Sequence, residues 1–178
     1  MSHEFNVDEI LKMAEQIERN GARFYRKAAE VLEDRRVRKL LVDLAAWEED
    51  HERIFAAMRA DLTENERQPT VFDPENESAL YLRSMVDGHV FYIRQDPNTL
   101  LTGKETAEEI LQLAIGQEKD SIVFYLGLKE FTQEKQGRER IDGVIKDVQT
   151  EREYAKGFLT PGSGTSDSEN SDDTGGGE

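Results

Sequence analysis

Ionisable side chains interrupt several helix-period stripes of apolar residues in this sequence. Glu18 and Glu118 each lie inside such a stripe, and they are 100 positions apart. Glu48 and His51 interrupt a third stripe at i and i+3, so both side chains point to one side of a helix. Carboxylates are almost never fully buried unless they are paired or bound to a metal, because desolvating a lone charge is very costly. These four residues therefore predict a cation site inside a helical bundle.

The competing interpretation is that these charges lie at the stripe edges, where they reach solvent or pair with Arg and Lys. The Glu-x-x-His motif is short and does not decide between the two interpretations on its own. The gap-free repetition of Glu18 as Glu118, with Glu48 thirty residues after Glu18, favours metal binding.

The donor types indicate which metal such a site would hold. A Glu from each of two helices, together with Glu-x-x-His from the others, is the ligand set of carboxylate-bridged di-iron bundles. Carboxylate and imidazole ligands suit iron, in a di-iron or mono-iron site, and manganese is the alternative. The chain has no cysteine, which excludes disulfides, thiolate zinc sites, iron–sulfur centres, a rubredoxin-type iron site and a cysteine nucleophile.

Four long helical patterns surround these residues. The first and third begin at capping-box sequences, Asn6–Glu9 and Thr106–Glu109. The second is expected over about 34–61 and the fourth over about 137–158. The long crossover between the second and the third is predicted to carry a short amphipathic helix at about 79–93.

An internal repeat organises these helices. The first and third share one pattern at a shift of 100 residues, and the second and fourth also match, so the repeated units are about 6–61 and 106–158. Two helical hairpins joined by a long crossover predict an all-α, ferritin-like four-helix bundle over residues 1–159. Residues 160–178 contain five acids, no base and no large apolar side chain, which predicts a disordered, acidic, Gly/Ser-rich tail.

Four segments carry a more specific resemblance. The runs AEQIERNGARFYRKAAE and LLVDLAAWEEDHERIF are similar to the first hairpin of the rubrerythrin branch of the ferritin-like superfamily. LAIGQEKDSIVFYLGL resembles the third helix of that branch, and YLRSMVDGHVF resembles its linking segment. The resemblance covers about residues 7–159 and implies a carboxylate-bridged di-iron centre that reacts with peroxide or dioxygen, or oxidises ferrous iron. It places Glu18, Glu48, His51 and Glu118 at the ligand positions of the family.

The fourth helix departs from the family pattern, and its register has two interpretations. A shift of 100 places Val148 opposite Glu48 and Glu151 opposite His51, which removes one bridging carboxylate. A shift of 103, with three extra residues in the second hairpin loop, places Glu151 opposite Glu48 and Tyr154 opposite His51. The second interpretation is preferred because it matches a carboxylate to a carboxylate and keeps the apolar stripe. Glu151 is therefore the fifth predicted metal ligand.

Two further expectations concern the surroundings of the site. Tyr25 and Tyr125 stand two turns after Glu18 and Glu118, and simple packing with a satisfied hydroxyl is expected; hydrogen bonding to the metal ligands is the alternative. An empty site would also crowd like charges, so changing either Glu18 or Glu118 to Gln is expected to stabilise the metal-free protein.

Charge and composition restrict the partners. The chain has 38 acidic against 23 basic residues, a formal charge of −15, which argues against nucleic acid or an anionic membrane surface. Its start has neither the basic nor the apolar region of a signal peptide, and no uncharged apolar stretch approaches membrane-spanning length, so a cytoplasmic protein is expected.

The leading hypothesis for function is an iron-binding oxidoreductase of peroxidase or ferroxidase type, acting on peroxide or dioxygen in oxidative stress. Because the chain has no cysteine for a rubredoxin module, turnover would need a separate electron donor. A homodimer is compatible with such a bundle. The alternative is a ferritin-like scaffold with a degraded metal site that acts as a binding or structural protein, and the missing second histidine favours it.

Overall fold

The computed structural model describes residues 7–64 and 101–159, which form four long α-helices. The helices are α1 (Val7–Val31), α2 (Arg35–Ala60), α4 (Ala107–Phe131) and α5 (Lys135–Leu159). The described part of the chain contains no strand, so the predicted all-α class is confirmed. The predicted helix at about 79–93 and the predicted tail at 160–178 lie outside the described residues.

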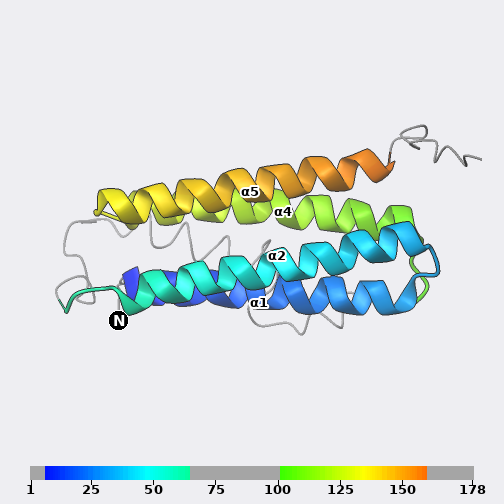
Figure 1. The fold of residues 1–178 in the computed structure, drawn as a ribbon, viewed down its shortest axis with the longest axis horizontal. Coiled ribbons are helices and arrows are strands. Elements are labelled where there is room, and N and C mark those ends of the chain that lie inside the picture. The colour runs from blue at the N-terminus through cyan, green and yellow to red at the C-terminus, as the bar shows by residue number, and fades with distance from the viewer. Residues whose placement is uncertain (1–6, 65–100, 160–178) are drawn as a thin grey trace, which may run out of the picture.

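The helices form two antiparallel hairpins that lie side by side (Figure 1). α1 and α2 make the first hairpin and α4 and α5 the second; α1 also packs on α4, and α2 on α5. α2 ends at one end of the bundle and α4 begins at the other, so the chain between them has to span the bundle length (Figure 1). This is the arrangement of a four-helix bundle with one crossover.

Local capping explains both ends of α2 and the start of α4. The Asp34 side chain accepts hydrogen bonds from the backbone N–H groups of Arg36 (2.8 Å) and Val37 (3.2 Å), which fixes the start of α2. Thr106 and Glu109 form the predicted capping box at the start of α4. Asp61 closes α2, as predicted, whereas the predicted cap at Asn6 lies outside the described residues.

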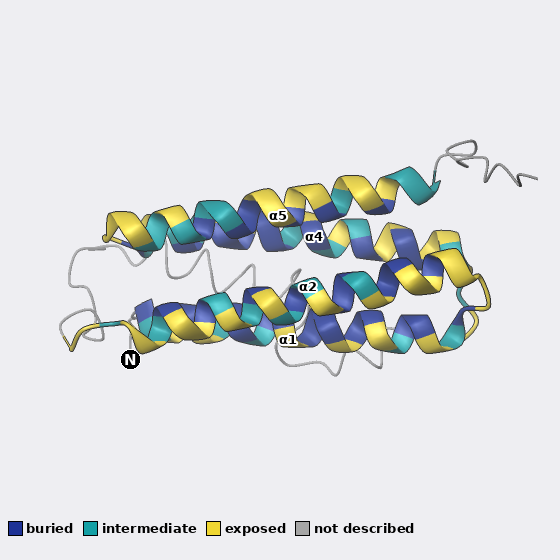
Figure 2. Ribbon diagram, in the orientation of Figure 1, coloured by how far each residue is buried: buried dark blue, intermediate teal, exposed yellow. Residues whose placement is uncertain are grey.

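The core is the apolar stripe of each helix turned toward the others. Figure 2 shows buried residues on the sides where the helices face one another, and exposed residues on the outer sides. The largest fully buried side chains are aromatic: Phe24, Tyr25, Phe55, Phe124 and Tyr125. They come from α1, α2 and α4 and fill the core with ring surface.

The register of α5 is 100, and the preferred shift of 103 is wrong. Residues 32–34 join α1 to α2, and residues 132–134 join α4 to α5, so the second loop has no insertion. Burial agrees with this register. Six of the nine buried positions of α2 have a buried partner 100 residues later: Leu41 and Ile141, Leu44 and Val144, Ala45 and Ile145, Glu48 and Val148, His51 and Glu151, Phe55 and Ala155.

A shift of 103 would pair residues from opposite environments. It would match buried His51 with Tyr154, which is 46% exposed, and Val42, which is 55% exposed, with buried Ile145. Three residues are close to one helical turn, so the sequence stripe looked similar in both registers. The equal loop lengths decide between them.

Candidate metal centre

Five ionisable side chains meet in the middle of the bundle. Glu18 comes from α1, Glu48 and His51 from α2, Glu118 from α4 and Glu151 from α5. Each of these residues is between 1% and 4% exposed. The structure therefore brings together all five residues that the sequence analysis selected, and it takes at least one from every helix.

The five residues form two overlapping groups of potential ligands. In one group Glu18, Glu48 and His51 place ligand atoms within 4.8 Å of one another, and in the other Glu48, Glu118 and Glu151 do so. Glu48 belongs to both groups, as a bridging carboxylate would. The first group offers a nitrogen donor, whereas the second offers carboxylate oxygens alone.

Several atoms of the cluster lack a protein partner. Among the described residues, Glu48 Oε1, His51 Nδ1 and Glu151 Oε2 are buried and have no hydrogen bond. His51 Nδ1 is 3.7 Å from Glu18 Oε2, and His51 Nε2 is 3.7 Å from Glu151 Oε1, both beyond hydrogen-bond length. Buried polar atoms are nearly always satisfied, so three such atoms in one cluster fit a site that receives a cation.

Two tyrosines form hydrogen bonds with the Glu18 and Glu118 carboxylates. The Tyr25 hydroxyl donates to Glu118, and the Tyr125 hydroxyl donates to Glu18, so each hydrogen bond crosses from one hairpin to the other. Both tyrosines are fully buried, and the Tyr125 ring packs on Phe55 with 4.9 Å between centroids. The expectation of simple packing was incomplete, because these hydroxyls are satisfied by the predicted ligands themselves.

Burial raises the pKa of three of the carboxyl groups. Burial, followed by the charge of Glu18, raises the pKa of Glu48 well above its ordinary value. Burial, followed by the charge of Glu151, raises the pKa of Glu118 to about 8. Burial also raises the pKa of Glu151 to about 7, although the nearby His51 acts in the opposite direction. At neutral pH the metal-free cluster therefore holds protons on carboxyl groups.

Glu18 and His51 behave as an ion pair. Burial alone would raise the pKa of Glu18, but its contacts with Glu48 and His51 outweigh burial and lower it. Burial alone would lower the pKa of His51, but Glu18 outweighs it and raises this pKa to about 9. In the metal-free protein a carboxylate at Glu18 thus faces an imidazolium at His51.

Tyr154 lies outside the cluster, contrary to the preferred register. Its ring packs on Trp47, with 6.1 Å between centroids, and on Phe158, with 5.4 Å. The position that repeats Glu48 holds Val148, which is 1% exposed. Glu151 reaches the centre as the counterpart of His51, so the cluster has one shared carboxylate rather than two.

One residue beside the cluster was missed by the sequence analysis. Asp147 Oδ2 is 3.9 Å from His51 Nε2, at the edge of a groove of about 320 Å³ between α2 and α5. Its i, i+4 spacing from Glu151 was the available signal, because it puts both acids on one helix face. An exposed Asp in a chain with 38 acids does not stand out by type alone.

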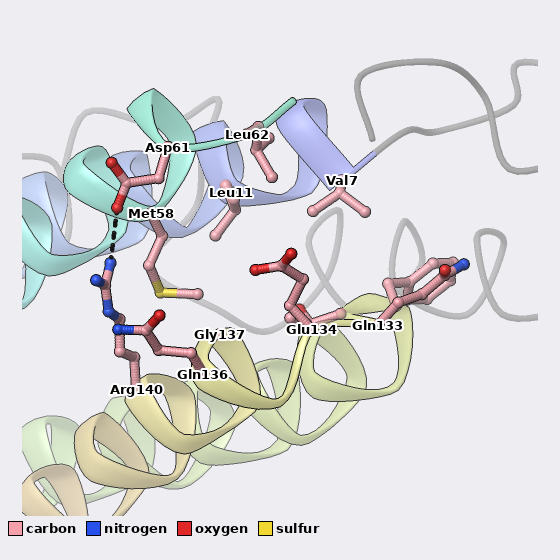
Figure 3. A pocket seen from close by; sticks show the side chains of 12 residues that line it. Val7, Leu11, Met58, Asp61, Leu62, Gln133, Glu134, Gln136, Gly137 and Arg140 are labelled. Carbon is pink, nitrogen blue, oxygen red and sulfur yellow. Dashed lines mark hydrogen bonds and ion pairs between the residues drawn. The ribbon is translucent and has the colours of Figure 1, made fainter. Parts of the chain in front are cut away.

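A second cavity lies at the end of the bundle, away from the cluster (Figure 3). It has a volume of about 200 Å³ and lies between the start of α1, the end of α2 and the α4–α5 loop. Leu11 and Met58 line it, and a 3.1 Å ion pair between Arg140 and Asp61 lies at its edge. None of the five cluster residues lines this cavity, so it has no part in the centre.

Four helices with one long crossover, closed around a buried Glu/His cluster, define a ferritin-like bundle. A sequence model of the rubrerythrin family matches residues 9–147. The chain belongs to the rubrerythrin family.

Comparison with solved structures agrees with this fold. A crystal structure described as a ferritin-like diiron-carboxylate protein from Thermotoga maritima superimposes with a TM-score of 0.65 at 22% identity. The alignment covers 89% of this chain and 97% of that one. A search of curated protein sequences gives no match. Within residues 7–64 and 101–159, no helix is long and apolar enough to cross a membrane.

Proposed function

We propose that the chain binds iron at the five-residue centre and carries out redox chemistry with peroxide or dioxygen there. The observation that carries the proposal is a set of three buried ligand atoms that have no hydrogen-bond partner among the described residues, in a cluster drawn from the four described helices. The donors are hard carboxylate oxygens with one imidazole, which suits iron and also accommodates manganese. Membership of the rubrerythrin family supports the same conclusion.

The proposed ligand roles follow the register of α5. Glu48 is the shared carboxylate, since it belongs to both groups of potential ligands. Glu18 and His51 serve one half of the site, and Glu118 and Glu151 serve the other. We infer two metal positions of unequal character, because only the first half includes a nitrogen donor.

The protein positions these ligands and limits access to them. Iron bound here would supply the electron-transfer chemistry toward peroxide or dioxygen. Tyr25 and Tyr125 hold the Glu118 and Glu18 carboxylates in place and carry protons next to them. The low exposure of the cluster excludes bulk water. Since the chain has no cysteine, a separate electron donor would reduce the centre between turnovers.

Anaerobic titration of metal-stripped protein with Fe²⁺ tests the proposal. We expect two Fe²⁺ per chain, and on addition of peroxide or dioxygen a near-ultraviolet absorbance from ferric iron. Glu48→Gln should weaken both positions because the residue is shared. Glu49→Gln is the matched control: the neighbouring glutamate forms a surface ion pair with Arg26, so its loss should leave the stoichiometry unchanged.

The alternative function is a ferritin-like scaffold with a degraded metal site. It is favoured by Val148, which stands where the repeat would supply a second shared carboxylate, and by the lack of a second histidine in the cluster. A parent protein that binds no Fe²⁺ or Mn²⁺ in this titration would support the scaffold and contradict the iron-binding function. Binding without any reaction toward either oxidant would restrict the function to metal binding.

A further inference from the structure

The buried centre has a groove on one side through which a cation could approach. The groove lies between α2 and α5, and of the five cluster residues His51 and Glu151 line it. Both side chains are at most 5% exposed, and Glu151 Oε2 has no hydrogen-bond partner among the described residues. The groove therefore ends on two proposed ligands, one of which has an unsatisfied oxygen.

Asp147 lies between the buried end of the groove and the solvent. Its side chain is 65% exposed, yet its Oδ2 is 3.9 Å from His51 Nε2. It lies one turn before Glu151 on α5, so both carboxylates project from the same helix face. A cation held by Asp147 would be within a few ångströms of the first buried ligand atoms while still in contact with water.

The charge of the groove suits a divalent cation. Asp50 and Asp147 both line it, and its lining within the described residues includes no lysine or arginine. Acidic side chains thus outnumber His51, the one basic side chain of this lining, and an excess of one sign of charge in a cleft raises the local concentration of counter-ions. Asp50 forms an ion pair with Arg53, which leaves Asp147 as the acid that borders on the His51 imidazole.

The internal repeat shows that this acid breaks the symmetry of the groove. At the shift of 100, Asp147 occupies the position of Trp47, and both residues line the groove. One hairpin thus contributes an aromatic wall, which packs on Tyr154, and the other contributes a carboxylate beside the cluster.

We propose that Asp147 is a metal-capture residue: it binds an incoming divalent cation at the mouth of the groove and transfers it to His51 and Glu151. This inference rests on the proposed function of the centre as a metal site. Asp147 contributes to the rates of metal uptake and release and is not a permanent ligand. A residue that stabilises the cation only during its passage through the groove changes the rates of uptake and release by the same factor. It leaves the equilibrium affinity unchanged.

Stopped-flow mixing of the metal-stripped full chain with Co²⁺ tests this role. Trp47 is the only tryptophan of the chain and lines the groove, so quenching of its emission by Co²⁺ reports arrival of the ion, and visible absorbance reports ligation. At low ionic strength Asp147→Asn should slow uptake and release about three- to tenfold, with unchanged stoichiometry and Kd. The difference should shrink toward about 0.5 M salt, where exposed charges are screened.

Glu139→Gln is the matched control for this experiment. It removes one exposed negative charge from the same helix, two turns away and outside the groove, and should leave the rates at the parent value. Equal slowing by Glu139→Gln would show a general charge effect and overturn the capture role. Unchanged rates in Asp147→Asn would also overturn it, and a loss of Kd or stoichiometry would make Asp147 a permanent ligand instead. A parent chain that takes up neither Co²⁺ nor Fe²⁺ would overturn the proposed metal site itself. Normal loading of Asp147→Asn at the rate of the parent would overturn the capture role alone.

Discussion

At the scale of single residues, Glu18 and Glu118 occupy repeated positions in different electrostatic surroundings. Glu18 contacts Glu48 and faces His51, and these two neighbours keep its pKa below the ordinary value despite burial. Burial and the nearby Glu151 raise the pKa of Glu118 to about 8. The repeat makes the two residues equivalent in the sequence, and this equivalence predicts the same response to substitution. In the structure their surroundings differ, because α2 places His51 beside Glu18 whereas α5 places Glu151 near Glu118.

We therefore expect opposite effects of the two Gln substitutions on the metal-free protein. Glu118→Gln should raise the free energy of unfolding at pH 7–8 by about 1–3 kcal/mol, because the amide replaces a carboxyl group that folding forces to stay protonated. Glu18→Gln should lower it by about 3 kcal/mol, because it removes one partner of a buried ion pair. Urea denaturation of metal-stripped proteins measures both changes.

The pH dependence of the change in the free energy of unfolding is the control for these two variants. The gain from Glu118→Gln should shrink as the pH falls and should nearly vanish below about pH 4, where a carboxyl group with the ordinary pKa of 4.5 is largely protonated on unfolding. Both variants should bind Fe²⁺ more weakly than the parent. Changes of the same sign in the two variants at pH 7–8 would contradict the different surroundings described here.

At the scale of the helices, the register of α5 decides which side chains enter the centre. Because the two hairpin loops have equal lengths, Val148 takes the place that repeats Glu48. Glu151 then takes the place that repeats His51, and Tyr154 turns outward onto Trp47. The second hairpin thus contributes Glu118 and Glu151 to the cluster and has no counterpart of Glu48.

Two substitutions in α5 test this register. Val148→Glu should cost the metal-free protein several kcal/mol, because it buries a carboxylate without a partner, and Fe²⁺ should restore the stability by using it as a second shared ligand. Tyr154→His should leave metal content at the parent level, since this position is 46% exposed and outside the cluster. Thermal unfolding with and without metal, together with metal analysis, checks both. Higher metal content in Tyr154→His, with no rescue of Val148→Glu, would favour a shift of 103.

The glycines of α5 offer an independent test of its packing. A Cβ at Gly143 would meet no atom within 4 Å, so Gly143→Ala should raise stability by about 0.5–1 kcal/mol through helix propensity. A Cβ at Gly137 would lie 2.7 Å from the Thr132 side-chain methyl, so Gly137→Ala should gain less or lose stability. The melting temperatures of the two variants, compared with the parent, measure this difference. An equal gain in both would contradict the close approach at Gly137.

At the scale of the whole molecule, the metal-free centre stores protons that the unfolded chain would release. Although burial acts against it, contact with Glu18 raises the pKa of His51 to about 9 from an ordinary 6.5. Burial raises the pKa of Glu118 to about 8 and that of Glu151 to about 7, from an ordinary 4.5. Between about pH 5 and pH 9 the folded state therefore binds more protons than the unfolded state.

The stability of the metal-free protein should consequently fall as the pH rises from about 5 to about 9. The sign follows because the free energy of unfolding decreases with pH wherever the folded state holds more protons. Metal binding displaces these protons, so the apparent affinity for Fe²⁺ should increase over the same range. Chemical denaturation and metal titration at several pH values measure the two trends. A stability that is constant or rises across this range would show that the carboxyl groups are ionised in the empty site.

The sequence alone determined the helices and four of the five residues of the cluster. Capping at Asp34, Asp61 and Thr106 involves neighbours in sequence, so helix ends were predictable to within about two residues. Glu18, Glu48, His51 and Glu118 were predictable because charged side chains on an apolar stripe are costly without a cation. Glu151 was selected through the shift of 103, and it reaches the cluster in the other register, as the counterpart of His51. The predicted crossover helix and tail lie outside the described residues and stay predictions.

Only the tertiary structure decided the register of α5, the tyrosine hydrogen bonds between hairpins, the unequal pKa values and the position of Asp147 beside His51. A shift of three residues leaves a helical stripe nearly unchanged, so periodicity could not choose between registers. The other three features depend on distances between helices that are far apart in the sequence. Such distances are fixed by how the four helices pack, because hydrogen bonds and charge interactions inside a protein change strongly over a few ångströms.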